Sequence, residues 1–235
     1  MIKKRIIPVI LVLTMAVNAG FAFEFVKPKI EQKAVMQKIG IDHNVYDISD
    51  EKLLVLEKTY KNVTKEKSVI IALELLKNTV GSYSRDAILG FNLTERPIRV
   101  QFKDLGEINP AFANYDALGS KAGQRLYINI NKKHFNAPPI ALAALLAHEA
   151  LHQDPYNSIN EETYAWTMEA AVWTQLSEAY PKDAEVYHPL VQRENALKKM
   201  FIKGNYTDQY IRKSIMANPA YAQLPSRSPG FEDSL

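Results

Sequence analysis

The chain reads PPIALAALLAHEALH over residues 138–152, and this stretch decides the predicted fold. It is apolar at every position except His148, Glu149 and His152, and the proline pair at its start suits the first turn of a helix, where a missing N–H costs little. A helix that is apolar on all faces is normally buried. We therefore predict a central, buried helix over residues 138–153.

The three polar side chains of this helix need partners, because burying two imidazoles and a carboxylate without them costs several kcal/mol. His148 and His152 are four positions apart and share one helix face, so both rings can reach one ion. Glu149 is turned by about 100° and lies beside that ion. In this His-Glu-x-x-His arrangement the histidines bind zinc and the glutamate is the general base toward zinc-bound water. The spacing leaves open a structural cluster satisfied by hydrogen bonds.

A third ligand is expected near the histidines, because catalytic zinc takes three protein ligands and keeps one open position. Pro155 ends the first helix, and the sequence from Ser158 to Glu161 opens a second one, over residues 159–178, as a capping box. Two helices joined by so short a loop lie antiparallel. The first turn of the second helix should therefore face His152.

Two neighbouring acids, Glu161 and Glu162, compete for the role of third ligand. The capping box accounts for Glu161, whereas Glu162 has no structural role, so we favour Glu162. Glu169, two turns further along, is a more distant candidate or a partner that orients a ligand. Trp166 and Trp173 are seven residues apart, which indicates a core-facing stripe rather than a sugar-stacking platform.

These segments resemble a known family. His148-Glu149-Ala150-Leu151-His152 followed by Glu161-Glu162-Thr163-Tyr164-Ala165 is similar to the zincin metallopeptidases whose third ligand is glutamate, the gluzincins. Small residues commonly follow that glutamate at the next and third-next positions, as Thr163 and Ala165 follow Glu162. The resemblance spans residues 124–178. It implies a zinc peptidase fold in which an edge strand, here residues 125–130, pairs with the substrate backbone.

Other polar residues have less specific interpretations. Asp154 either ends the helix or orients a ligand histidine. His188 or Tyr187 is a candidate for a group that stabilises the transition state, because such a group is required. His43 and His134 lie in polar stretches and are predicted to be surface residues.

The rest of the chain predicts a mostly helical α+β fold with a small mixed sheet. Residues 96–102 and 125–130 alternate apolar and polar side chains and indicate two or three strands. Helices are expected in residues 23–80 and near 189–202 and 208–217. Their apolar stripes before residue 81 are Leu53, Leu56, Tyr60 and Val63, and Val69, Ala72, Leu73, Leu76 and Val80. We divide the chain into an N-terminal helical region (23–80), a metallopeptidase core (81–180) and a C-terminal helical segment with its tail (181–235).

The first 22 residues have the layout of a secretory signal peptide. A cationic start, Lys3 to Arg5, precedes an apolar run over residues 6–17, and small residues follow, with cleavage expected after Ala22 or Ala19. The apolar run is too short to span a bilayer. We expect a bacterial-type export to the periplasm or the medium and no membrane span after the signal is removed.

Composition narrows the possible functions. The chain has no cysteine, so any metal site must use His, Asp or Glu. Three of the 29 Lys and Arg residues lie in the first 22 residues, which contain no acid, so the remainder has 26 basic and 26 acidic residues and nucleic acid is not an expected partner. We expect an exported zinc metallopeptidase acting on peptides or proteins, or alternatively a non-catalytic exported helical binding protein with a structural metal or a hydrogen-bonded His/Glu cluster.

Overall fold

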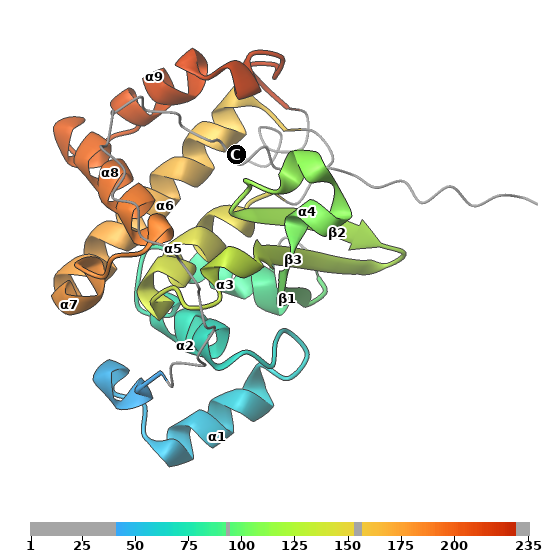
Figure 1. Ribbon diagram of the computed structural model, residues 1–235, viewed down its shortest axis with the longest axis vertical. Helices are drawn as coiled ribbons and strands as arrows, with labels where there is room; N and C mark the ends of the chain where they lie inside the picture. The colour runs from blue at the N-terminus through green and yellow to red at the C-terminus, as the bar shows by residue number, and fades with distance from the viewer. Residues whose placement is uncertain (1–40, 93–94, 153–156, 229–235) are drawn as a thin grey trace, which may run out of the picture.

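The computed structural model describes residues 41–92, 95–152 and 157–228 (Figure 1). The predicted signal peptide (1–22) and Asp154 lie outside the described residues. The described chain is mostly helical with one small mixed sheet, which confirms the predicted α+β class. No helix within it combines the length and the apolarity that crossing a bilayer requires.

The elements follow the chain in a simple order. The α-helices are α1 (Asp50–Thr59), α2 (Lys67–Leu76), α3 (Ser82–Leu89), α4 (Leu105–Ile108), α5 (Pro139–Glu149), α6 (Ile159–Ala179), α7 (Pro181–Ala184), α8 (Pro189–Lys203) and α9 (Gln209–Ala217). The strands are β1 (Ile98–Lys103), β2 (Ala117–Ala122) and β3 (Arg125–Asn131). Short 3-10 helices are η1 (His43–Tyr46), η2 (Pro110–Phe112), η3 (Lys132–His134) and η4 (Pro219–Tyr221).

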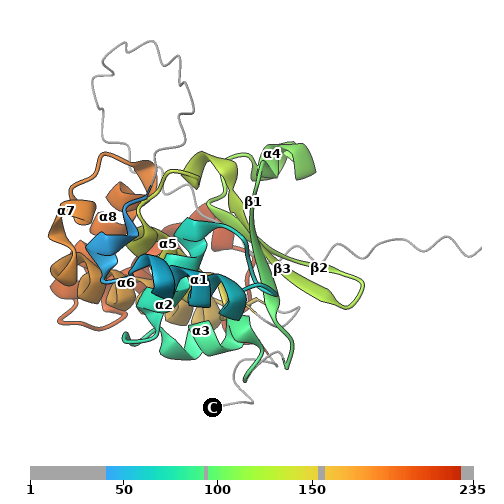
Figure 2. The ribbon, with the colours of Figure 1, turned by 90° about the horizontal axis from the view of Figure 1, so that it is seen from below.

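The sheet has the strand order β1-β3-β2 and lies along one side of the helical body (Figure 2). β1 runs parallel to β3 with Val100 opposite Ile128, and β2 runs antiparallel to β3 with Gly119 opposite Ile128. The prediction that residues 125–130 form an edge strand is therefore wrong. Residues 123 and 124 make a two-residue turn that folds β2 back onto β3, so β3 is hydrogen-bonded on both sides.

Helix α5 forms the centre of the core, as its sequence predicts. Every residue of Pro139–Glu149 is buried, and the helix packs between α2 on one side and α6 on the other. The buried stripes of α1 and α2 join the same core, which confirms their predicted faces except at Val80, which is 46% exposed. Val80 lies beyond the end of α2, so the helical spacing no longer applies to it.

Two features of the helices differ from the prediction. α5 ends at Glu149, earlier than residue 153, because the chain tightens there and the Leu151 N–H donates to the carbonyl of His148. α3 lies between the predicted helical region (23–80) and the first predicted strand (96–102), where no helix was expected. It is a short helix between Gly81 and Gly90, and Gly90 ends it with a φ of 80°.

The last described residues return to the start of α6. The N–H groups of Ile159 and Asn160 donate to the carbonyls of Pro225 and Ser226 at 2.9 and 3.2 Å. These are donors that a helix N-terminus leaves without intrahelical partners. The C-terminal segment therefore caps the helix that carries Glu162.

Candidate metal centre

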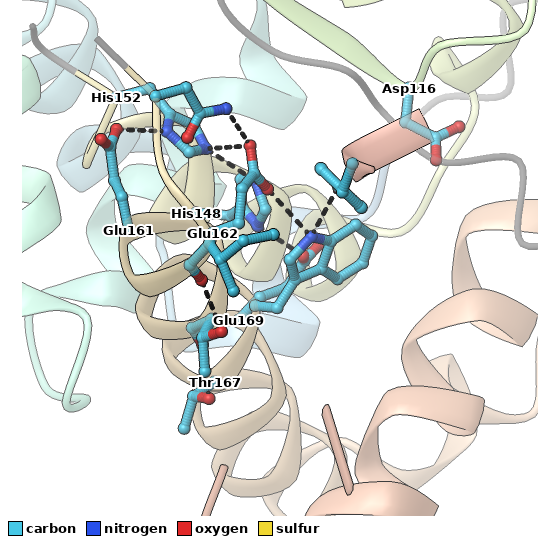
Figure 3. Close-up of polar contacts among 12 residues, drawn as sticks. Asp116, His148, His152, Glu161, Glu162, Thr167 and Glu169 are labelled. Carbon is cyan, nitrogen blue, oxygen red and sulfur yellow. Dashed lines mark hydrogen bonds and ion pairs between the residues drawn. The ribbon is translucent and has the colours of Figure 1, made fainter. Parts of the chain in front are cut away.

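The candidate metal centre lies where α5 ends and α6 begins (Figure 3). His148 and Glu149 belong to the last turn of α5, and His152 follows three residues after the helix ends. Glu162 lies in the first turn of α6, whose start is fixed by the Ser158 hydroxyl accepting from the Glu161 N–H at 3.1 Å. The antiparallel α5–α6 pair thus brings the histidines and Glu162 together, as the sequence spacing predicts.

Three buried side chains converge at this point. His148 Nε2 and His152 Nε2 are 3.0 Å apart, and Glu162 approaches them with Oε2 4.0 Å from His148 Nε2 and Oε1 3.8 Å from His152 Nε2. One ligand atom from each residue lies within 4.8 Å of the others, and the residues are 8% exposed or less. The group can hold a metal ion.

Carboxylates lie behind both imidazoles. Glu161 Oε1 is 2.8 Å from His152 Nδ1, and Glu169 Oε2 is 3.1 Å from His148 Nδ1. The first contact is a hydrogen bond, whereas the second is a close ion-pair contact between two atoms that have no hydrogen-bond partner among the described residues. A carboxylate accepts the Nδ1 proton of a neutral imidazole, which leaves the Nε2 lone pair pointing forward.

The side of the cluster opposite these carboxylates therefore presents several lone pairs to one point. Two Nε2 atoms and the Glu162 carboxylate face one another, and a positive charge between them stabilises this arrangement. The neighbouring carboxylates favour such a positive charge. Although burial opposes it, Glu162 and Glu161 raise the pKa of His152 to about 9. Burial and the neighbouring His152 lower the pKa of His148 well below its ordinary value. A proton on His152 satisfies the two nitrogens, and a divalent cation satisfies all three groups.

Glu149 lies beside the group and is not one of its three members. It is 3% exposed, and its Oε2 atom is buried with no hydrogen-bond partner among the described residues. Burial raises the pKa of Glu149 to about 7, with His152 opposing the rise and Glu162 adding to it. A carboxyl that titrates near neutrality is suited to accepting and returning a proton.

The orientation of Glu162 is set by groups from three segments. Asn157 Nδ2 donates to its Oε1, and the indole N–H of Trp166 donates to its Oε2 at 3.2 Å. Tyr221 of η4 accepts a second hydrogen bond from the same indole at 3.0 Å, and burial, with the Glu162 carboxylate adding to it, raises the pKa of this phenol well above its ordinary value. Trp166 and Trp173 are buried, which agrees with the predicted stripe.

The two acids that competed for the ligand role have separate positions. Glu162 faces both Nε2 atoms, whereas Glu161 contacts the opposite nitrogen of His152 and also the Ser228 hydroxyl at 3.4 Å. The carboxylate of Glu161 is thus engaged with a ring, and the Ser158 N–H donates to Asn157 instead. Glu169 occupies the position of a partner that orients His148.

The remaining histidine predictions have mixed outcomes. The prediction that His134 is a surface residue is wrong: it lies in η3, is 0% exposed and pairs at 2.6 Å with Asp116, a residue 18 positions earlier that the local sequence does not reveal as its partner. His43 is also largely covered and pairs with Asp50. His188 caps α8 by accepting from the Leu190 N–H.

Tyr187 is 89% exposed, and the contacts of His188 are with η3 and α8, so the structure does not bring either to the three ligand candidates. Both were candidates for stabilising the transition state. Neither residue is therefore assigned the role of stabilising the transition state.

A buried charged cluster next to the candidate centre is not predicted by the sequence. It is formed by Asp116, Glu169, Arg193 and Glu194. Asp116 and Arg193 are 77 residues apart, so no local spacing connects them. One signal was present: Glu194 lies on the apolar stripe of α8, which also includes Leu190, Leu197 and Phe201.

No protein-family model, curated protein or solved structure matches this chain.

Proposed function

We propose that this protein is an exported zinc-dependent metallopeptidase in which His148, His152 and Glu162 hold the metal. One observation carries the proposal: three buried ligand-type side chains converge within 4.8 Å, with a fourth buried acid, Glu149, beside them. A purely structural cluster has no need for the extra acid, whose burial costs free energy.

The donor set supports zinc as the metal. Two imidazole nitrogens and one carboxylate are the ligands of catalytic zinc in peptidases, and three protein ligands leave one coordination position open. When bound, zinc supplies a Lewis acid that polarises the peptide carbonyl and lowers the pKa of a water molecule.

The protein's own residues account for the proton transfers. Glu149 accepts a proton from the attacking water on its unpaired Oε2 and then delivers it to the leaving amine. Its pKa, raised by burial to about 7, allows both steps near neutral pH. Glu161 and Glu169 hold the two rings so that their Nε2 atoms stay directed at the metal position.

A second candidate is a helical binding protein in which the metal only joins α5 to α6. The burial of the centre favours it, because each of the four side chains is 8% exposed or less and a peptide needs access to the metal. A structural site has closed, four-ligand coordination.

Metal content and hydrolysis together test the proposal. We expect about one zinc per chain by mass spectrometry in the protein purified without chelator. His148→Ala should lose the zinc, whereas Glu149→Gln should keep it and lose nearly all cleavage of a peptide library. His43→Ala is the matched control, since His43 pairs with Asp50 and lies in η1, and it should keep both properties.

Two results would decide against the enzyme. A protein without bound metal contradicts the site itself. Full zinc content with no cleavage of proteins, peptides or cell-wall peptide fragments would favour the binding protein instead.

A further inference from the structure

Arg193 lies at the centre of the charged cluster beside the candidate metal centre. Its Nη1 is 3.0 Å from Asp116 Oδ2, its Nη2 is 2.9 Å from Glu194 Oε1, and Nη2 also pairs with Glu169. Glu169 and Glu194 are 0% exposed. A single guanidinium thus holds carboxylates from α6, from α8 and from the residue before β2.

Arg193 is connected to the candidate metal centre first through Glu169. This carboxylate uses Oε1 for Arg193 and presents Oε2 to His148 Nδ1 at 3.1 Å. With one oxygen fixed by the guanidinium, the carboxylate plane is fixed as well. The direction of the His148 ring therefore depends on Arg193.

The second connection runs through Trp166. The guanidinium carbon lies 4.9 Å from the centre of the indole ring, a stacking distance, and the indole N–H donates to Glu162 Oε2. The ring plane determines where this N–H points. Arg193 thereby also supports the position of Glu162.

From these two connections we propose that Arg193 is a positioning residue of the metal centre, which orients His148 through Glu169 and Glu162 through Trp166. The inference rests on the proposed metal site and adds to it the residue that keeps two of the three ligands in place. A lysine cannot replace it, because an ammonium group has neither the planar fork nor the stacking face.

The test compares zinc affinity in matched variants, using zinc and a competing chelator at pH 7. Arg193→Met should raise the zinc dissociation constant roughly ten- to hundredfold, the range for groups that orient metal ligands. Arg85→Met is the control, because Arg85 also combines an ion pair, with Asp86, and a stacked ring, on Tyr60, but contacts no ligand. We expect its zinc affinity within about threefold of the parent protein.

The conservative variant separates positioning from simple charge balance. Arg193→Lys keeps a positive charge among the carboxylates and should recover much of the melting temperature of the metal-free protein. Its zinc dissociation constant should still be raised roughly tenfold. Full recovery of zinc affinity by lysine would overturn the proposal in favour of a charge effect.

Two further variants apply if Arg193→Met does not fold. Glu169→Gln breaks the first connection, and Trp166→Phe breaks the second, with Trp173→Phe as the matched control because its indole donates to Asn195 instead. The first two should weaken zinc binding and the control should not. Parent-like affinity in both would overturn the role of Arg193, whereas a parent protein that binds no zinc would overturn the metal site itself.

Discussion

Glu149→Gln should make the metal-free protein more stable at alkaline pH, although the same change removes the proposed base. Burial raises the pKa of Glu149 from its ordinary 4.5 to about 7. The folded protein then holds this proton more tightly than the unfolded chain between those values. Stability therefore falls as the pH rises from about 4.5 to 7, and above 7 the full cost of an ionised, buried carboxylate remains.

The size of the effect follows from the pKa. A displacement from 4.5 to about 7, at roughly 1.4 kcal/mol for each pH unit, corresponds to about 3 kcal/mol at pH 8. The same linkage gives about 1 kcal/mol at pH 5. Glutamine has nearly the shape of glutamate and no charge, so the variant avoids this cost.

Urea unfolding of chelator-treated protein at pH 5 and pH 8 measures the difference. We expect the free energy of unfolding of Glu149→Gln to exceed that of the parent by about 1 kcal/mol at pH 5 and about 3 kcal/mol at pH 8. Glu178→Gln is the control, since Glu178 is 68% exposed, and it should change little at either pH. A gain that is independent of pH, or a loss of stability at pH 8, would refute the reasoning.

Two more predictions concern parts of the fold that support the site. Gly90→Ala should destabilise the protein by about 1–3 kcal/mol, because φ is 80° and an added Cβ would lie 2.4 Å from the carbonyl carbon of Arg96; an unchanged melting temperature would contradict this. Asp116→Asn should cost about 3 kcal/mol at pH 7, since it removes the buried negative charge that pairs with Arg193 and His134. Although burial opposes it, Arg193 and then His134 lower the pKa of Asp116 below its ordinary 3.8, so this stabilisation is lost as the pH falls below about 4. The gap in stability between the variant and the parent should therefore narrow as the pH falls from about 4 to 2, and urea unfolding that shows a constant gap would argue against the ion pair.

Much of the helical structure could be predicted because its determinants are local. The apolar run before His148 can only be buried, and Ser158 marks the start of α6 within one residue. The i, i+4 spacing of the histidines and the short connection to Glu162 bring three side chains together without any long-range information. Residues that are close in the sequence are here also close in space.

The parts that escaped prediction depend on contacts between distant segments. β3 is the middle strand because β2, whose residues do not alternate clearly, folds back onto it. Arg193 joins Asp116 across 77 residues, and Tyr221 reaches Trp166 across 55. Such partners are determined by how helices pack, which no spacing within one segment expresses.

The capping of α6 by residues 225 and 226 makes the candidate metal centre dependent on a distant segment of the chain. Pro225 and Ser226 supply the carbonyls for the first N–H groups of α6, and the Ser228 hydroxyl contacts Glu161 behind His152. The first turn of the helix that bears Glu162 therefore depends on residues that lie more than 60 positions later in the sequence. A deletion that removes residues 225–228 would act directly on the candidate metal centre, although none of these residues belongs to it.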